Sequence, residues 1–331
     1  NTTYMMMMRP FSLMVWGTLA LAARCINAGG VVGETKKGIL FAEDLILSAE
    51  AGNSYGVTAA LGAGVAVDSE HRGDPALRRA AMLGYADIVC ILLQADADPN
   101  LKDINGRSAL FYASQKNHVE ILRQLLDAGA EPNIRENVNG DSPLHAAVFF
   151  QSKECVQMLL ENFADYNSRN NLGETPVYLS AKAGNENVAR MLVQAGADLD
   201  IQTTERRWTA LILAVAMKRN NFVELLINAR ADTNLRDHSG RTALSQCAIV
   251  GNDDAVPVLL RNGADPLVRD NEDRSPLYLA LRNGKDAVVN LLVAELQATY
   301  GDRWKQVVQF EKTTDAATRV EKYIREKLED L

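Results

Sequence analysis

The chain has 331 residues, with 35 Lys and Arg against 42 Asp and Glu, which gives a formal net charge of −7. No run of Lys or Arg exceeds two residues, so the sequence lacks the basic footprint of a nucleic-acid-binding protein. Apolar residues make up 47% and charged residues 23%, proportions that exclude a mainly disordered chain and predict a buried core.

The amino end has the pattern of a secretory leader. Arg9 precedes an apolar run over residues 11–23, and small residues follow it. The run is shorter than the roughly 20 apolar residues that span a bilayer. We therefore predict a signal peptide over residues 1–28, a linker over 29–39, a secreted or lumenal location, and no membrane span in the mature chain.

Two observations keep other interpretations of this end open. Residue 1 is Asn, so Met5 or a later Met is the expected start. Removing the leader leaves Cys90, Cys155 and Cys247, an odd number, whereas an oxidising compartment usually favours paired cysteines. An uncleaved anchor, a mitochondrial leader and a cytoplasmic location therefore remain alternatives.

A repeat of 33 or 34 residues organises the rest of the chain. Segments such as SPLHAAV and TALILAV recur, and their first residues are Ser108, Ser142, Thr175, Thr209, Thr242 and Ser275. Two aliphatic columns keep the same phase: Leu110, Leu144, Val177, Leu211, Leu244 and Leu277, and Leu125, Leu159, Leu192, Leu226, Leu259 and Leu292. Divergent copies occupy residues 44–61 and 75–93. This period predicts stacked units starting near residues 40, 70, 103, 137, 170, 204, 237 and 270.

These motifs resemble those of the ankyrin-repeat family, whose signature T-P-L-H-x-A is matched most closely by residues 142–147. The resemblance covers residues 40–296. It implies an all-α solenoid of stacked helix-turn-helix units with projecting β-hairpin loops. Residues 297–331 change pattern, with Val320, Ile324, Leu328 and Leu331 on one helical face. We predict a C-terminal helical cap there, with a docking helix for a partner as the alternative.

Departures from the repeat pattern carry their own expectations. One column after the second helix holds glycine in several units but Asp96, Phe163 and Arg230 in others. Because a left-handed residue commonly ends a helix, these non-glycine residues should be strained. Pro257 should fall in the first turn of a second helix, where proline is tolerated. Only His145 supplies the imidazole of the family motif, so packing should replace its hydrogen bonds elsewhere.

The sequence shows no machinery for catalysis. His71, His118, His145 and His238 fall in different columns and lack metal-ligand spacing. Phosphate-binding, dinucleotide-binding and nucleophile-elbow motifs are absent from the sequence. Cys90, Cys155 and Cys247 are expected to be small core residues. We therefore predict a protein that is not an enzyme and has no catalytic, cofactor-binding or metal site.

Two polar columns lie in the loops. The resemblance implies that Asn100, Asn133, Asn167 and Asn234 are possible substrates of an asparaginyl hydroxylase, while the simpler interpretation is that their side chains satisfy backbone groups in turns. Lys102, Arg135, Arg169, Arg236 and Arg269 form the second column, usually with an acid as the next residue. We expect these neighbours to form ion pairs along the loop edge, with a binding role as the alternative.

The resemblance also implies a concave binding face, formed by residues just before each Ser or Thr and seven or eight after it. Most units place polar residues there, but some place large apolar ones, which favour a partner. We predict a non-enzymatic scaffold that binds a protein or peptide and is monomeric, through Phe149, Phe150, Trp208, Met217, Ile249, Val250, Arg107, Arg241 and Arg274. Coverage of these side chains by neighbouring units, a regulatory or targeting segment of a larger enzyme assembly, and a secreted effector remain alternatives.

Overall fold

The structure, a computed structural model, describes residues 42–70 and 73–304. The predicted leader and linker, His71 and residues 305–331 of the predicted cap lie outside the described residues. The described helices are α2 (Ala42–Glu50), α3 (Ser54–Gly62), α4 (Ala76–Leu83), α5 (Ala86–Gln94), α6 (Ala109–Lys116), α7 (Val119–Asp127), α8 (Pro143–Phe149), α9 (Lys153–Glu161), α10 (Pro176–Ala183), α11 (Glu186–Gln194), α12 (Ala210–Ala216), α13 (Asn220–Asn228), α14 (Ala243–Val250), α15 (Ala255–Arg261), α16 (Pro276–Arg282), α17 (Asp286–Tyr300) and the 3-10 helix η1 (Gly301–Arg303).

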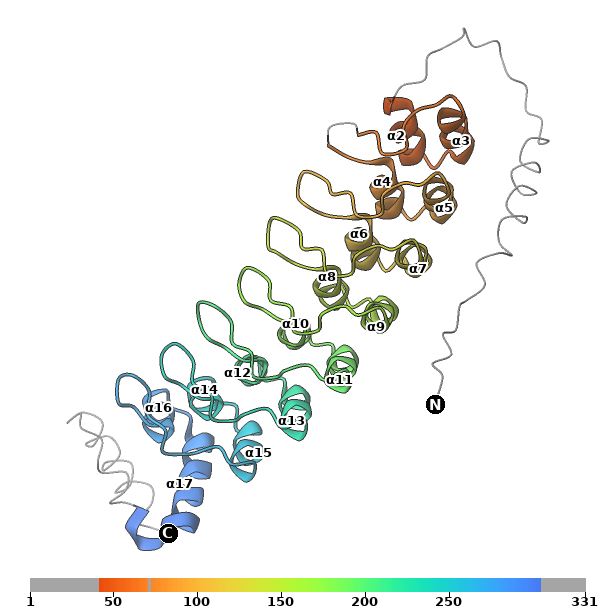
Figure 1. Cartoon of the computed structure of the whole chain (residues 1–331). Helices are drawn as coiled ribbons and strands as arrows, with labels where there is room; N and C mark the ends of the chain where they lie inside the picture. The colour runs from red at the N-terminus through yellow and green to blue at the C-terminus, as the bar shows by residue number, and fades with distance from the viewer. Residues whose placement is uncertain (1–41, 71–72, 305–331) are drawn as a thin grey trace, which may run out of the picture. The chain divides into compact units, whose positions relative to one another are not determined.

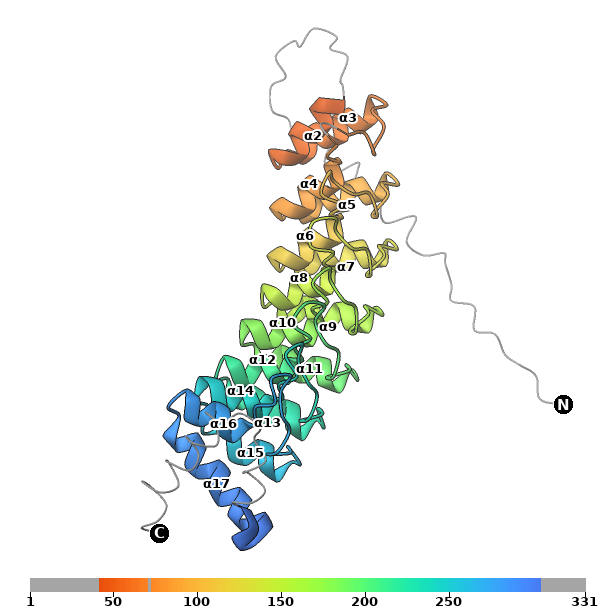
Figure 2. The ribbon, with the colours of Figure 1, turned by 90° about the vertical axis from the view of Figure 1, so that its left-hand side faces the viewer.

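The helices stack in two rows. Each even-numbered helix packs against the odd-numbered helix that follows it and against the even helices before and after it (Figures 1 and 2). The loops that lead into the even helices project from the even row (Figure 1). We call these segments, residues 103–107, 136–141, 170–174, 203–208, 237–241 and 270–274, the inter-pair loops. The predicted fold of stacked helix-turn-helix units is confirmed.

The recurring Ser or Thr begins each even helix from α6 onward. Its side-chain oxygen accepts the backbone N–H three residues later, as from Phe111 to Ser108 at 3.3 Å and from Ile212 to Thr209 at 3.2 Å. Such a cap satisfies an amide that the helix itself leaves unpaired. At Ser142 the imidazole of His145 also accepts the Ser142 N–H, which completes a capping box.

The two aliphatic columns form the core. Leu110, Leu144, Leu159 and Leu192 are fully buried, and the other members of both columns are likewise enclosed. A single helix pair has too little apolar area to close its own core, so burial depends on the next pair in the stack. The predicted core positions of Cys155 and Cys247 are confirmed, while Cys90 is half-buried.

The expected backbone strain after the odd helices is present. Asp96, Phe163 and Arg230 have φ of 62°, 62° and 68°, in the left-handed region that favours glycine. Pro257 lies in the first turn of α15, as predicted. These positions are therefore places where a substitution can relieve strain without disturbing the core.

Phe163→Gly is expected to raise the free energy of unfolding by about 1 kcal/mol. The left-handed conformation costs a residue with a Cβ roughly 1–2 kcal/mol. Glycine avoids this cost, but it loses more backbone entropy on folding, which offsets part of the gain. The Phe163 side chain is 88% exposed, so deleting it sacrifices little burial. Phe163→Ala is the matched control: it deletes the same ring but keeps Cβ, and should change stability by less than about 0.5 kcal/mol. Urea denaturation measures both. Equal gains in the two variants would show that the ring, not the backbone, sets the effect.

The inter-pair loops are tight hairpin turns rather than paired strands. Each is closed by one backbone hydrogen bond at its base, as from Asp237 N to Arg241 O at 2.8 Å and from Asp270 N to Arg274 O at 3.0 Å. The described residues form only the isolated β-bridges Glu70–Pro75 and Lys102–Ser108, and no strand. The hairpin arms are too short to extend the pairing.

A ladder of backbone hydrogen bonds joins successive inter-pair loops. From the second loop onward, an N–H near the tip donates to a carbonyl of the preceding loop: Asn137 to Asn105 at 2.8 Å, Asn171 to Asn139 at 2.8 Å, Thr204 to Leu172 at 2.9 Å, His238 to Arg206 at 2.9 Å and Asn271 to Ser239 at 2.9 Å. The loops are therefore coupled to one another as well as to their own helices.

The last odd helix is longer than the others. Helix α17 extends to Tyr300, past the predicted end of the repeats at residue 296, and packs on α15 and α16. Trp304, after η1, is buried. Residues 297–304 therefore continue the packed structure beyond the predicted repeats, and a C-terminal helical cap over residues 297–331 stays a prediction.

Candidate binding surface

Phe149 and Phe150 lie at the C-terminal end of α8 and face solvent. Phe149 ends the helix and Phe150 caps it, and their side chains are 48% and 51% exposed. The rings meet edge to face, with centroids 5.3 Å apart and an interplanar angle of 76°. Neighbouring repeats within the described residues therefore leave both rings accessible, contrary to the alternative that they are covered.

The other predicted apolar residues are more enclosed and fall at two different ends of the even helices. Met217, which caps α12, is 42% exposed. Ile249 and Val250 end α14 and are half-buried. Trp208 instead lies in the loop before α12, packs against the core and stacks 5.2 Å below the Arg206 guanidinium. The predicted residues thus form two rows rather than one patch.

We call the C-terminal ends of the even helices the rim. From α4 to α16 its exposed residues include Leu83, Lys116, Phe149, Phe150, Lys182, Met217 and Arg282, while the exposed Glu50 ends α2. Lys182 pairs with Glu174, Nζ to Oε1 at 2.8 Å, whereas Lys116 forms no ion pair with any described residue. The rim therefore combines large apolar groups with cations.

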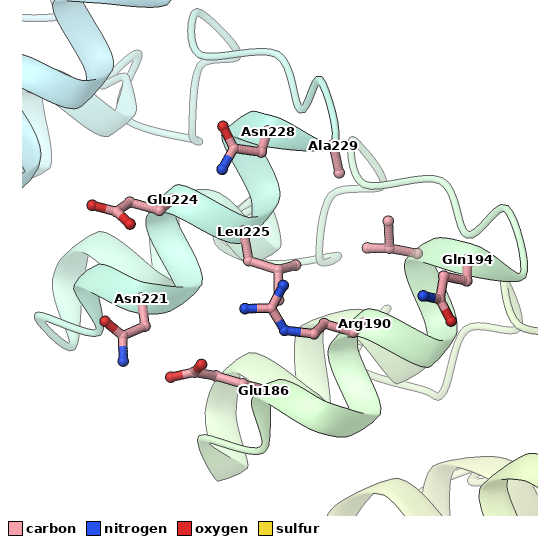
Figure 3. A pocket seen from close by; sticks show the side chains of 9 residues that line it. Glu186, Arg190, Gln194, Asn221, Glu224, Leu225, Asn228 and Ala229 are labelled. Carbon is pink, nitrogen blue, oxygen red and sulfur yellow. The ribbon is translucent and has the colours of Figure 1, made fainter.

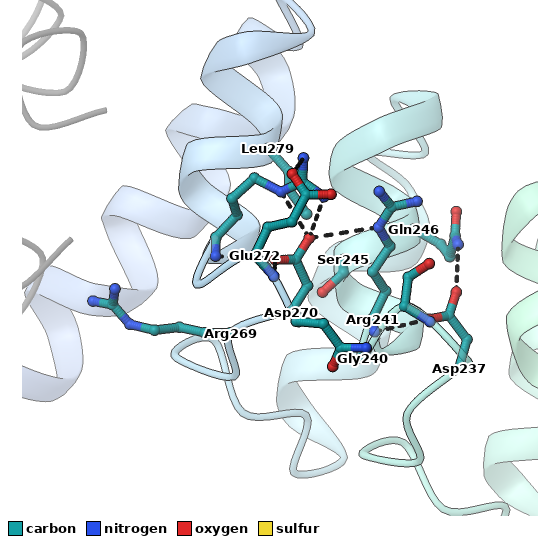
Figure 4. Close-up of polar contacts among 12 residues, drawn as sticks. Asp237, Gly240, Arg241, Ser245, Gln246, Arg269, Asp270, Glu272 and Leu279 are labelled. Atoms are coloured by element: carbon teal, nitrogen blue, oxygen red, sulfur yellow. Dashed lines mark hydrogen bonds and ion pairs between the residues drawn. The ribbon is translucent and has the colours of Figure 1, made fainter. Parts of the chain in front are cut away.

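The three predicted arginine anchors differ in accessibility. Arg107 is half-buried, and its guanidinium lies 5.5 Å over the Phe111 ring and 3.7 Å from Glu136. Its pKa is raised, mainly by the hydrogen bond with Tyr112. Arg241 is similarly half-buried, with Nε 3.6 Å from Asp270 (Figure 4). Both can still present part of a guanidinium to a partner.

Arg274 does not fit the predicted role of a surface anchor. Its side chain is buried, and its Nε and Nη2 donate to Asp270 Oδ2 at 2.8 and 2.7 Å. Its Nη1 lies 2.6 Å from Glu272. The guanidinium therefore makes its contacts within its own loop and is not accessible to a partner. We correct the prediction accordingly: Arg274 stabilises the loop.

The basic column makes different contacts from those predicted. Arg135 Nε donates to the Gly140 carbonyl at 2.7 Å, and Arg236 Nη2 donates to the Arg269 carbonyl of the next loop at 2.8 Å. Only Arg269 of this column pairs with an acid among the described residues, Asp273 at 3.3 Å. The acids that follow are used otherwise: Asp237 Oδ1 accepts the N–H groups of Ser239 and Arg241. The expected ion pairs along the loop edge were mostly wrong.

The asparagine column bridges neighbouring repeats. Oδ1 of Asn100, Asn133, Asn167 and Asn234 accepts a backbone N–H from the next repeat, at 2.8, 2.8, 2.8 and 2.9 Å. The simpler interpretation, that these side chains satisfy backbone groups, is confirmed. Hydroxylation of these residues stays a prediction, which mass spectrometry of the natural protein can test.

Asp200 occupies the same position and accepts the Asp232 N–H at 2.9 Å. Burial raises its pKa, and the carboxylates of Asp232 and Asp198 add to the rise, outweighing the hydrogen bond. The charged form is therefore disfavoured in the folded chain. An asparagine would accept the same hydrogen bond without that charge.

Asp200→Asn is accordingly expected to raise the free energy of unfolding at neutral pH, by less than about 1 kcal/mol because the site is partly solvated. When folding raises the pKa of an acid, protonation of that acid stabilises the folded chain relative to the unfolded one. The advantage of the variant should therefore shrink as pH falls through the pKa of Asp200. The reciprocal change Asn167→Asp, one repeat earlier, should lower stability at neutral pH. Urea denaturation across acidic and neutral pH tests both signs, and a gain that persists in acid would contradict the charge argument.

The sequence reasoning missed a second exposed apolar group. Ile104, Val138 and Leu172 stand on three successive inter-pair loops and are all exposed. They recur every 34 residues, so the same alignment that revealed the repeats could have found them. They lie on the loop side of the even row, away from the rim.

The described residues offer little for catalysis. They contain no group of three His, Cys, Asp or Glu side chains placed to hold a metal ion. Burial raises the pKa of Cys155 to about 12 and also raises that of Cys247, so neither thiol readily forms the nucleophilic thiolate. A hollow of about 520 Å³ between α11 and α13 is lined by Glu186, Arg190, Val193, Gln194, Asn221, Glu224, Leu225, Asn228 and Ala229 (Figure 3). It holds no nucleophile paired with a base.

No helix in residues 42–70 or 73–304 combines the length and apolar character needed to cross a bilayer.

Comparison with known proteins finds a family model described as ankyrin repeats, in three copies over residues 77–170, 164–237 and 211–302.

Among curated proteins, the neurogenic locus notch homolog protein 1 of Danio rerio is 38% identical over 141 residues, which is 42% of this chain and 6% of that protein. The human notch homolog protein 1 is 37% identical over 142 residues, 43% of this chain and 6% of that protein. The human notch homolog protein 2 is 33% identical over 135 residues, 40% and 5% respectively. The matched region is thus a small part of each relative.

Proposed function

The chain belongs to the ankyrin-repeat family, whose repeats generally mediate protein–protein interaction, and from this premise we propose that it is a non-enzymatic scaffold that binds a protein or peptide segment. The observation that carries the proposal is the pair of half-exposed rings of Phe149 and Phe150 on the rim. Adjacent exposed aromatic rings are costly in water and are typical of interaction sites.

The rest of the proposed site follows the rim and the base of the loops. Met217, Ile249 and Val250 extend the apolar rim toward the C-terminus. Trp208, Arg107 and Arg241 supply half-buried groups at the opposite ends of the even helices. Arginine and tryptophan are among the residue types enriched at interface hot spots. We propose that the scaffold acts as a monomer and does not bind nucleic acid.

Affinity capture with the full chain tests this proposal. Phe149→Ala combined with Phe150→Ala should weaken binding of captured partners by about 30-fold or more, the loss typical of a hot spot. Phe163→Ala is the matched control, since it removes an even more exposed ring from the turn after α9 and should leave binding unchanged. Capture that survives the rim double variant would refute the site, provided that circular dichroism shows intact helices.

A second candidate is a regulatory or targeting segment of a larger enzyme assembly. Its support is that the curated relatives carry the matched region as about 6% of their length, so repeats of this kind occur as a small part of longer proteins. The sequence of the full-length transcript distinguishes the two candidates, since a neighbouring catalytic domain would appear there.

The location of the protein is a separate proposal. The leader pattern supports a secreted or lumenal protein, with a secreted effector as one form of it, while the unpaired Cys90, Cys155 and Cys247 support the cytoplasmic alternative. N-terminal sequencing of the natural protein tests it: a mature end near Ala23 or Gly29 supports export, and an intact leader contradicts it.

A further inference from the structure

Charge is segregated between the two rows of helices. The even helices α4 to α16 contain Arg78, Arg79, Lys116, Lys182 and Arg282 but no Asp or Glu. The odd helices α5 to α17 carry mostly acids, among them Asp87, Glu120, Glu154, Glu161, Glu186, Glu224 and Asp286. In a chain of net charge −7, the even row from α4 to α16 is thus cationic or neutral, whereas α2 carries Glu43, Asp44 and Glu50. Of these cations Arg78 is buried, and the others reach the surface.

The cations of the rim stand on either side of the aromatic pair. Helices α6 and α10 are the two even helices that pack against α8. Lys116 ends α6 and Lys182 lies in the last turn of α10, at the positions that Phe149 and Phe150 occupy on α8. Because stacked helices are roughly 8–10 Å apart, each ammonium group is within reach of a ligand seated on the two rings.

Helix electrostatics accounts for only part of this arrangement. A cation in the last turn of a helix is stabilised by the helix dipole, typically by about 0.3–1 kcal/mol. That effect explains why lysine is tolerated at the ends of α6 and α10. It does not explain why the helix between them ends in two exposed phenylalanines, which gain nothing from the dipole and lose by contact with water.

We propose that the rim around α8 binds an acidic peptide segment that carries a large apolar side chain. The apolar group packs on Phe149 and Phe150, and flanking carboxylates lie near Lys116 and Lys182. Complementary charge of this kind speeds association and excludes partners of the wrong sign more than it adds affinity. The proposal rests on the proposed function, because it names the chemistry of the partner for the same surface.

Selection from a displayed library of random short peptides, with the full chain as bait, tests the proposal. The selected peptides should be rich in Asp and Glu around a Phe, Trp or Leu. Lys116→Gln combined with Lys182→Gln should weaken their binding by about three- to tenfold at low salt, and the difference should close at high salt. Glutamine keeps a donor for Glu174, the partner of Lys182 in the folded chain.

Two further variants separate the possible outcomes. Arg190→Gln, which removes an exposed cation from α11 beside the hollow of Figure 3, should leave binding unchanged. Neutral or basic peptides, or binding insensitive to the lysine double variant, would overturn this inference. If neutral or basic peptides are selected and their binding still requires Phe149 and Phe150, the proposed function stands and only the inference of an acidic partner fails. Peptides that bind the Phe149→Ala/Phe150→Ala chain equally well, or a failure to select any, count against both.

Discussion

Asp270→Ala is expected to lower the free energy of unfolding by about 3–5 kcal/mol, the loss typical of a buried ion pair from which one partner is removed. The Asp270 side chain is fully enclosed and accepts the N–H groups of Glu272 and Arg274 at 2.9 and 3.0 Å. The same carboxylate pairs with the buried guanidinium of Arg274 and lies 3.6 Å from Arg241 (Figure 4). Its removal leaves two amides without their acceptor, and leaves the buried Arg274 guanidinium with only the exposed Glu272 as an ion-pair partner.

Asp237→Ala provides the matched control, one repeat earlier in the same position. Asp237 also accepts two loop amides, at 2.8 and 2.9 Å, but its side-chain partner is the uncharged Gln246. Its loss should therefore be about 1–3 kcal/mol, the cost of unsatisfied polar groups. Urea denaturation followed by circular dichroism measures both variants. Equal losses in the two variants would show that the ion pair with Arg274 adds nothing to the free energy of unfolding beyond the hydrogen bonds to the loop amides.

The same substitution should change the pH dependence of stability. Burial alone would raise the pKa of Asp270, but hydrogen bonds from the Arg274 side chain and from the amides of Arg274 and Glu272 outweigh it, so the pKa lies below its usual value. A carboxyl whose pKa is depressed by folding stabilises the chain above its unfolded pKa, about 3.9, and loses that effect as pH falls. The difference between the natural chain and Asp270→Ala should therefore narrow in acid.

Phe222→Ala is the second large effect, with an expected loss of about 3–5 kcal/mol. Phe222 is fully buried in α13 and is the largest of the fully buried side chains. Its counterparts in the neighbouring odd helices are Val188 and Ala255, which are much smaller. The ring therefore fills space that neither neighbouring helix can fill, and truncation leaves a cavity between repeats.

A pair of controls fixes the origin of that loss. Met217→Ala removes a side chain of similar apolar character from the exposed rim and should change stability by less than about 0.5 kcal/mol. Phe222→Leu should lose roughly half as much as the alanine variant or less, because it retains most of the volume. A Phe222→Leu chain as unstable as Phe222→Ala would mean that ring shape, rather than volume, matters.

Much of the fold could be predicted from the sequence because each repeat restates the same local chemistry. The Ser or Thr that caps each even helix, the aliphatic columns and the strained Phe163 and Arg230 all follow from position in the period. Their environment is set by the backbone of one unit and its two neighbours, so a column in the sequence is a column in space.

The candidate surface was harder to predict because equal positions in the period need not have equal surroundings. Arg107, Arg241 and Arg274 share a column, yet only Arg274 is drawn into its loop, because Asp270 and Glu272 are both placed to pair with it. Trp208 and Met217 belong to one predicted site but lie at opposite ends of α12. At 1.5 Å per residue, their separation along the helix is about 13 Å.

The ladder of hydrogen bonds between inter-pair loops has a mechanical consequence. Among the described residues these bonds join each loop only to its immediate neighbours in the stack, so a displacement of one loop reaches a distant loop through every loop between them. Binding of one ligand should therefore change the affinity for a second ligand several units away only slightly. A solenoid of this kind can bind separate ligands independently at distant repeats. Coupling between such sites would require the loops that separate them to move together.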